Sequence, residues 1–199
     1  MRATRSWSRR HAPSSKPWAR GFCPRPRRGS GCSFTDVAGI PIYQTPILPQ
    51  WIDYNGHLRD AYYVLIVSQA TDALMDRIGL DEAYRRRTQC TLYTVELHIQ
   101  YLHEVKQTDT ALVAMRILGA DAKRIHAAFE LTSAGSTRVA AVAEVMLLHV
   151  QQRGDTVTTA ALPAEVSAAI AQLQAAGAGL AAATPGSRRL ELRGSSRAP

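Results

Sequence analysis

The feature that most constrains the fold is an apolar run at residues 61–67, Ala-Tyr-Tyr-Val-Leu-Ile-Val, directly after Asp60. A helix that is apolar on every side must be enclosed by other elements over most of its circumference. The helical pattern continues to about residue 86, although Gly79 can break or kink it. We therefore expect one long helix over residues 60–86, packed inside the molecule and ending at three arginines, which the helix dipole favours there.

Four apolar segments with a strand-like pattern follow this helix, and short gaps separate them. They lie at residues 91–104, 111–118, 124–132 and 139–151. Short connections predict antiparallel pairing. Residues 47–52 predict a short extended segment before the helix, and a last amphipathic helix begins near Pro163. One antiparallel sheet wrapped around one long helix is an α+β fold, and its edge strand predicts a homodimer or homotetramer.

The length of 199 residues suits one folded domain, flanked by two less regular ends. The first 35 residues hold eight arginines and one lysine but no acidic residue, which leaves 15 basic and 16 acidic residues for the rest. The net charge of +8 therefore belongs to the N-terminal segment. We expect a disordered basic tail at 1–36, the sheet domain at 37–155, and a C-terminal helix with a frayed end at 156–199.

Three interpretations of the basic tail are open: a nucleic-acid-binding arm, an organelle transit peptide, or an extension without function. Four prolines, at positions 13, 17, 24 and 26, break any amphipathic targeting helix. The sequence therefore favours the extension, and we expect no nucleic-acid partner.

Other classes of protein are disfavoured by the composition. No apolar run reaches the roughly 18 residues of a membrane span, and no secretory h-region is present. The three cysteines, Cys23, Cys32 and Cys90, have no metal-ligand spacing and form no disulfide framework. We expect a cytoplasmic protein without membrane contact.

The motif before the helix contains the candidate catalytic residues. It reads Trp-Ile-Asp-Tyr-Asn-Gly-His from Trp51 to His57. Gly56 permits the positive φ of a tight turn, and the helix start presents free N–H groups. A carboxylate beside such N–H groups suits acyl-group hydrolysis, which needs a base or nucleophile and a place for an oxyanion. Asp53 or Asn55 capping the helix is the structural alternative.

The pattern Asp-x-Asn-Gly-His-x-x-x-x-Tyr-Tyr also resembles the signature of hotdog-fold acyl-CoA and acyl-carrier thioesterases, the 4-hydroxybenzoyl-CoA thioesterase superfamily. Together with Glu-Leu-His at 96–98 and Lys-Arg-Ile-His at 123–126, it looks most like betainyl-CoA thioesterases of the carnitine pathway. The resemblance covers roughly residues 41–151. Many relatives carry Asn-Asn or Asn-Val where this chain has Arg59-Asp60.

The resemblance implies roles for individual residues. Asp53 would be the catalytic carboxylate, which attacks the thioester or activates water. Backbone N–H groups between Gly56 and Asp60 would form the oxyanion hole. Asn55 and His57 would belong to the site, and Glu104 would match a glutamate of the acyl-carrier relatives.

The expected substrate is an acyl-CoA, bound without a cofactor. Lys123 and Arg124 at a hairpin rim would bind the phosphates of CoA. A quaternary ammonium head would need an aromatic wall, and the candidates for it are Trp51, Tyr54, Tyr62 and Tyr63. A metal site built from His98 and His126 lacks a third ligand, so no metal is expected.

Two other functions compete with the thioesterase. A hotdog enoyl-CoA hydratase also has Asp-x-Asn, but its histidine follows the aspartate by five residues, whereas His57 follows Asp53 by four. A non-catalytic acyl-CoA binding module would not need the Asp53 carboxylate. The absence of a Gly-rich phosphate loop and of Gly-x-Ser-x-Gly argues against nucleotide hydrolysis and a serine hydrolase.

Overall fold

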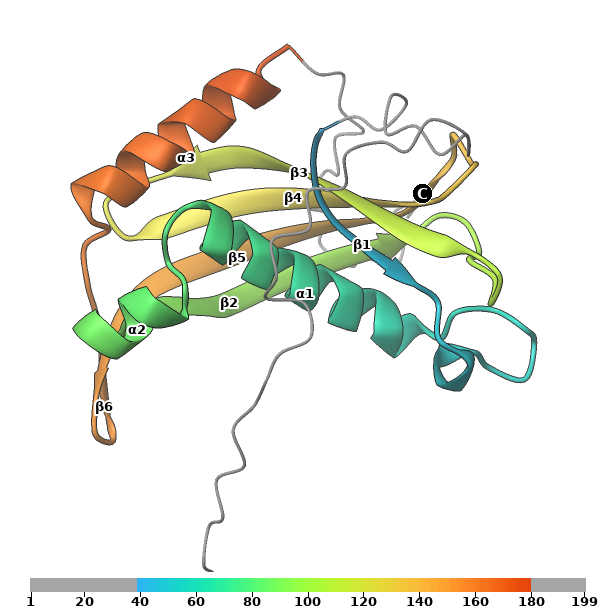
Figure 1. The fold of residues 1–199 in the computed structure, drawn as a ribbon, viewed down its shortest axis with the longest axis horizontal. Coiled ribbons are helices and arrows are strands. Elements are labelled where there is room, and N and C mark those ends of the chain that lie inside the picture. The colour runs from blue at the N-terminus through green and yellow to red at the C-terminus, as the bar shows by residue number, and fades with distance from the viewer. Residues whose placement is uncertain (1–38, 180–199) are drawn as a thin grey trace, which may run out of the picture. The chain divides into compact units, whose positions relative to one another are not determined.

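An antiparallel sheet with one long helix across it forms the centre of the molecule (Figure 1). The computed structural model describes residues 39–179. The strands are β1 (Ile40–Pro46), β2 (Cys90–Tyr101), β3 (Thr110–Ala120), β4 (Arg124–Ser133), β5 (Val139–Arg153) and β6 (Thr156–Thr159). Their order is β1-β3-β4-β5-β2, and β6 pairs with the end of β5. The predicted α+β class and antiparallel pairing are confirmed.

The helices divide differently from the prediction. They are α1 (Asp60–Arg77), α2 (Glu82–Thr88) and α3 (Ala164–Gly177), with a single 3-10 turn at Pro49–Trp51. The expected helix over residues 60–86 is two helices, because Gly79 adopts a φ of +84° and ends the first one. The short segment at 47–52 is not a strand; the strand precedes it and is β1.

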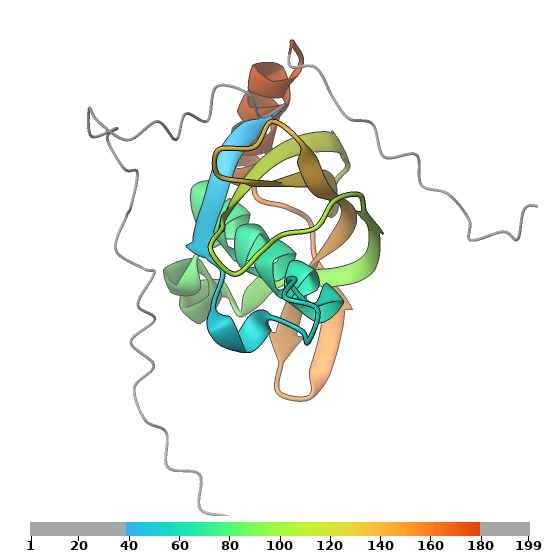
Figure 2. The same cartoon turned by 90° about the vertical axis from the view of Figure 1, so that its right-hand side faces the viewer.

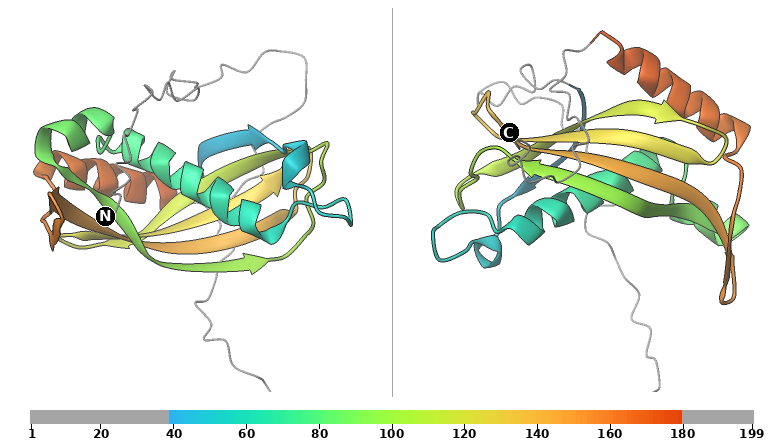
Figure 3. Two further views of the ribbon diagram at one scale, coloured as in Figure 1. Left: turned by 90° about the horizontal axis from the view of Figure 1, so that it is seen from below. Right: turned by 180° about the vertical axis from the view of Figure 1, so that it is seen from behind.

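The sheet curves around α1 when it is viewed along the helix (Figure 2), and α1 crosses its concave face in the views from below and from behind (Figure 3). The core side chains of α1 recur at helical spacing and are Tyr63, Ile66, Val67, Ala70, Thr71 and Leu74. The other side of α1 is not enclosed within the described chain, since Leu65 is 38% exposed. The expectation of burial on most of its circumference is therefore wrong for this part of the chain.

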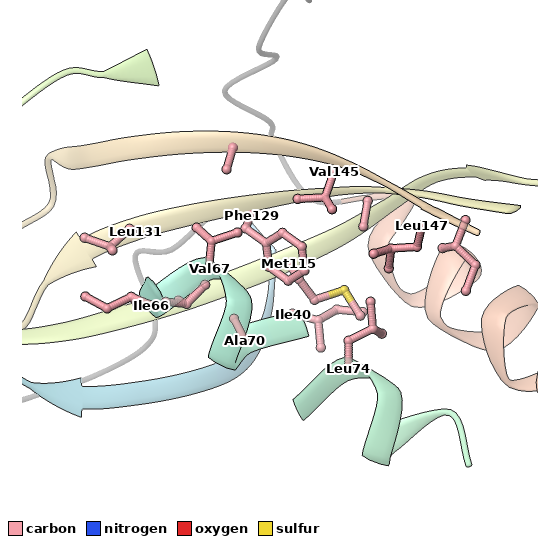
Figure 4. Close-up of a cluster of buried hydrophobic side chains, with 14 of the residues drawn as sticks. Ile40, Ile66, Val67, Ala70, Leu74, Met115, Phe129, Leu131, Val145 and Leu147 are labelled. Carbon is pink, nitrogen blue, oxygen red and sulfur yellow. The ribbon is translucent and has the colours of Figure 1, made fainter. Parts of the chain in front are cut away.

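The core lies between α1 and the inward-facing residues of β3, β4 and β5 (Figure 4). Met115, Phe129 and Leu147 come from these three strands and are essentially inaccessible to solvent. On α3, Val166 and Ile170 belong to the same cluster. Residues 156–177 thus share the sheet and core of the main domain, while the basic tail at 1–36 lies outside the described residues.

The sheet positions the candidate site through its last paired residues at one end. Tyr101, the last residue of β2, pairs with Ala141 of β5. The following Leu102 and His103 both donate backbone N–H groups to Ala140 O. This end of β2 lies beside the start of α1, because Tyr101 Oη donates to Asp60 O at 3.4 Å.

Candidate active site

A tight turn centred on Asn55 and Gly56 presents the motif residues. Asp53 Oδ1 accepts hydrogen bonds from the N–H groups of Asn55 (2.8 Å) and His57 (3.2 Å). The Gly56 N–H donates to Asp53 O at 3.1 Å, and Gly56 has a φ of +83°. The predicted turn glycine is confirmed. The alternative that Asp53 or Asn55 caps the helix is wrong, because the N-cap of α1 is Arg59, whose side chain forms no capping hydrogen bond within residues 39–179; Asp53 organises the turn instead.

The second carboxylate oxygen of Asp53 is less engaged. Within residues 39–179, Oδ2 receives only a long hydrogen bond from Asn55 Nδ2, at 3.4 Å. The hydrogen bond from the His57 N–H to the carboxylate holds the pKa of Asp53 below its ordinary value. The carboxylate is therefore ionised at neutral pH, with one oxygen fixed by the turn.

The turn is tied to the segment that follows β2. The Leu58 N–H donates to Val105 O at 2.7 Å, and His57 forms an isolated bridge with Lys106. These contacts place the His57 imidazole against the Glu104 carboxylate, with Nε2 and Oε2 3.0 Å apart. The two predicted site residues, 47 positions apart, are thus brought into direct contact.

The backbone N–H groups of the expected oxyanion hole differ in whether they already donate a hydrogen bond. The N–H groups of residues 56–59 already donate to acceptors within the chain. Asp60 begins α1, and among residues 39–179 its N–H has no acceptor. The Asp60 carboxylate caps the next residue, since Oδ1 accepts from the Ala61 N–H at 2.8 Å. Asp60 is therefore the free donor of this set, and Gly56 is not.

An open pocket of about 280 Å³ lies at this corner of the domain. Its lining comes from the turn, the start of α1 and the end of β2: His57, Leu58, Asp60, Tyr63, Tyr101, Leu102, His103 and Glu104. Asp53 and Asn55 lie on the same turn as His57 but do not line the pocket. A more polar depression adjoins the pocket through Leu102, His103 and Glu104, and Lys106 and Arg138 also line it.

The aromatic residues divide between the pocket and its surroundings. Tyr63 and Tyr101 line the pocket and meet edge to face, with ring centroids 5.2 Å apart. Burial raises the pKa of Tyr63 to about 12 and also raises that of Tyr101, so both phenols stay protonated. Tyr62 stacks on Trp51 at 5.5 Å instead, and Tyr54 is 97% exposed. Neither Tyr54 nor Tyr62 lines the pocket.

Of the four aromatic residues predicted to face the substrate, Tyr63 lines the pocket; Tyr101 also lines it and is missing from the prediction. The sequence carried a signal for Tyr101, because it ends the alternating segment three residues before Glu104. What the sequence could not provide is the packing of that strand end against the start of α1.

Lys123 and Arg124 lie at the other end of the sheet. Arg124 pairs with Leu148, which in turn pairs with Tyr93 near the start of β2. Asp121 accepts from the Arg124 guanidinium and from two backbone N–H groups of the same turn. The structure therefore does not bring these two basic residues to the pocket of their own chain.

Two histidines outside the pocket, His98 and His126, pair with carboxylates. His98 contacts Glu96 at 2.8 Å, and His126 contacts Glu144 at 3.0 Å. No group of three or more candidate metal ligands occurs among the described residues. Within the same part of the chain, no helix is both long and apolar enough to cross a membrane.

Comparison with known proteins identifies the family. Residues 47–170 match the model of the thioesterase-like superfamily. A betainyl-CoA thioesterase from Pseudomonas aeruginosa is 49% identical over 115 residues, which cover 58% of this chain and 72% of that protein.

Two solved structures extend the similarity to the fold. A crystal structure assigned to a thioesterase from Pseudomonas putida KT2440 has 39% identity and a TM-score of 0.69, covering 79% of this chain and 99% of that one. A hypothetical protein from Staphylococcus aureus in complex with CoA has 26% identity and a TM-score of 0.64, covering 75% and 98%. The resemblance noted in the sequence is confirmed: the chain belongs to the thioesterase-like superfamily and is a thioester hydrolase.

Proposed function

We propose that the protein hydrolyses the thioester of a small acyl-CoA to the free acid and CoA, with betainyl-CoA as the leading candidate. The observation that carries this proposal is the corner at the start of α1. There a free Asp60 N–H and the His57–Glu104 pair line one pocket, beside the Asp53 turn. The 49% identical betainyl-CoA thioesterase supports the choice of substrate.

Asp53 is the proposed nucleophile. The lowered pKa keeps the Asp53 carboxylate ionised at neutral pH, and among the described residues its Oδ2 has only the long hydrogen bond from Asn55. In the proposed first step Oδ2 bonds to the thioester carbonyl carbon, the C–S bond breaks, and CoA leaves as a thiolate. The acyl group remains on Asp53 as an anhydride.

His57 and Glu104 serve the second step. With His57 Nε2–H donating to Glu104, the other ring nitrogen can take a proton from water. The water oxygen bonds to the acyl carbon, the anhydride opens, the Asp53 carboxylate is regenerated and the free acid leaves. His57 then gives its proton to the thiolate. In both steps the Asp60 N–H donates to the oxygen that becomes negative.

The pocket also suits a cationic acyl group. The carboxylates of Asp60 and Glu104 line it together with the rings of Tyr63 and Tyr101. A quaternary ammonium is attracted by ring faces and by nearby carboxylates. Because both phenols stay protonated, this attraction does not depend on pH in the neutral range.

The test of the nucleophile is Asp53→Asn, since Asn keeps an oxygen for the turn but loses the negative charge. We expect kcat to fall by at least about a hundredfold, with an unchanged melting temperature. Asp121→Asn is the matched control, because Asp121 also accepts turn N–H groups but lies at the other end of the sheet. Equal turnover of Asp53→Asn and the control would exclude a catalytic Asp53.

Substrate recognition is tested with betainyl-CoA and its neutral isostere, 3,3-dimethylbutanoyl-CoA, in which carbon replaces the quaternary nitrogen. The two thioesters differ in intrinsic reactivity, but this difference is the same for every variant of the protein. The ratio of their kcat/KM values therefore reports the protein's contribution when Tyr101→Leu is compared with the wild type. We expect the preference for betainyl-CoA to fall by roughly threefold to thirtyfold. An unchanged ratio would show that the Tyr101 ring does not recognise the cation, and binding without turnover would indicate a binding module.

A further inference from the structure

The pocket offers few free hydrogen-bond donors to a bound thioester. Tyr63 Oη donates to the backbone carbonyl of His103 at 3.4 Å. Tyr101 Oη donates to the backbone carbonyl of Asp60, also at 3.4 Å. The His57 imidazole pairs through Nε2 with a lining carboxylate. The other lining side chains are two leucines, two carboxylates and the ring of His103. In the described part of the chain, that ring is the one lining side chain still able to donate to a substrate.

His103 is held in place at three points. It lies between the pocket and the adjoining polar depression, and it lines both. Its backbone N–H donates to Ala140 O on β5 at 3.0 Å, and its carbonyl accepts from Tyr63 Oη on α1. Its ring Nδ1 lies 2.9 Å from Nη2 of Arg138. The backbone and the imidazole are therefore both fixed relative to the pocket.

The contact with Arg138 determines the tautomer of the His103 ring. A guanidinium group can only donate hydrogen bonds, so the His103 Nδ1 must accept with its lone pair. The ring proton of the neutral imidazole is then on Nε2. Among residues 39–179, this Nε2–H has no acceptor. The arrangement therefore leaves a fixed N–H donor on a side chain that lines the pocket.

The charge of the pocket explains why such a donor is needed. Asp60 and Glu104 contribute carboxylates, and the described lining includes no Lys or Arg. Attack by Asp53 would place a further negative charge on the thioester oxygen, for which the Asp60 N–H is the free backbone donor. Repulsion between this oxygen and the two carboxylates opposes the reaction unless further donors face the oxygen.

The Arg138 guanidinium can supply positive charge through the ring of His103. It lines the adjoining depression rather than the pocket, and within residues 39–179 it pairs with no carboxylate. Its backbone N–H donates to Ser136 Oγ at 3.1 Å, which holds it in the turn before β5. A cation bonded to Nδ1 polarises the imidazole and makes its Nε2–H a stronger donor. A neutral imidazole that donates in this way is an effective electrophile toward a carbonyl oxygen.

We propose that His103 is a further catalytic residue, whose Nε2–H joins the Asp60 N–H in binding the oxyanion, and that Arg138 is the positioning residue that fixes its tautomer. This proposal rests on the proposed function. When Asp53 Oδ2 bonds to the carbonyl carbon, the π electrons of the C=O bond move to the oxygen, which accepts from both donors. When the C–S bond breaks, these electrons re-form the C=O bond and the thiolate leaves. His103 keeps its proton throughout.

The first experiment compares two substitutions of His103. His103→Asn keeps an acceptor for Arg138 but has no atom at the place of Nε2, whereas His103→Gln can place an amide N–H there. We expect kcat for the acyl-CoA to fall by about a hundredfold in His103→Asn, as for a lost oxyanion donor, and to recover by about tenfold in His103→Gln. His98→Asn is the control, because His98 is also an exposed histidine of β2 but pairs with a carboxylate outside the pocket. It should change kcat by less than about twofold.

Product inhibition separates an oxyanion donor from a residue that binds CoA. The inhibition constant of free CoA should be the same in His103→Asn and in the wild type, because CoA has no thioester carbonyl. A kcat of His103→Asn equal to that of the wild type would overturn the proposal. A rise in the inhibition constant that matches the loss in kcat/KM would also overturn it, since His103 would then bind CoA rather than the oxyanion.

A double-mutant cycle tests whether Arg138 acts through His103. Arg138→Gln should lower kcat by roughly tenfold when His103 is present, but by less than about twofold in His103→Asn. Arg138→Lys keeps a cationic donor and should retain most of the activity. Additive losses would show that Arg138 acts independently and would overturn its positioning role.

The proposed function fails in a different way. Wild-type protein that hydrolyses no acyl-CoA would refute the proposed function and this proposal with it. An active wild type with a fully active His103→Asn would refute this proposal alone, so the two failures are distinguishable.

Discussion

Asp53 and Asp121 use the same local chemistry in two different places. Each side chain accepts two backbone N–H groups of its own turn, and each has a lowered pKa. The difference is in the second oxygen. Asp121 Oδ2 accepts from the Arg124 guanidinium, whereas Asp53 Oδ2 has only a long contact with Asn55 in the described part of the chain. An aspartate can thus hold a turn with one oxygen and keep the other for chemistry, so a structural role in the turn does not exclude a catalytic one.

The Asp121 pair makes a prediction about acid stability. The hydrogen bond from the Arg124 side chain, with those of two backbone N–H groups, lowers the pKa of Asp121 from 3.8 to about 2. A depressed folded-state pKa adds stability that is present above the unfolded value and is lost as the pH falls through the folded value. Between about pH 4 and pH 2, the melting temperature of Asp121→Asn should therefore fall less steeply than that of the wild type. Parallel curves would show that the Asp121–Arg124 contact adds nothing in solution.

At the scale of elements, the strand-like pattern of apolar residues made the long strands predictable. The segments at 91–104, 111–118, 124–132 and 139–151 correspond to β2 to β5 within a few residues. The sequence did not predict β1 and β6: β1 contains Pro41 and Pro46, and β6 is four exposed residues. The turn from Asp53 to His57 was predictable because its contacts are local in the sequence. The packing of a strand end against α1 was not predictable, and this is why the sequence assigned Lys123 to the candidate site.

The two sides of α1 predict unequal effects of the same substitution. Leu74→Ala removes a fully buried side chain of the core cluster and should cost about 2–5 kcal/mol of unfolding free energy. Leu65→Ala on the same helix removes an exposed one and should cost about 0.5 kcal/mol or less. Chemical denaturation of both variants measures this difference. Similar costs would mean that the outward side of α1 is covered in the assembled protein.

At the scale of the whole molecule, charge and fold are carried by different parts of the chain. The first 35 residues hold nine of the 24 basic residues, while the described core begins at Ile40. Elements from β1 to α3 contribute to one hydrophobic cluster. The overall basicity therefore says little about the surface around the pocket, where Asp60 and Glu104 stand beside two histidines.

Removing residues 1–36 should leave folding, assembly and turnover intact, because the core cluster contains residues from Ile40 onward. Thermal melting, sedimentation and steady-state kinetics of the truncated and full-length proteins make the comparison. We expect the truncated protein to lose only its affinity for polyanions such as heparin, because nine positive charges are removed. Aggregation or lost turnover after truncation would contradict this assignment.

The two edges of the sheet are not equivalent, and this limits how many sheets could join edge to edge. Among the described strands, β1 forms the edge opposite β2 and contains Pro41 and Pro46, paired with Ala114 and Thr110 of β3. A proline within a ladder has its missing N–H on the open side, so this edge cannot recruit a further strand at those positions. Two copies joined along β2 would use up both open edges. The prolines of β1 would then leave no edge on which a fibre could extend, however concentrated the protein became.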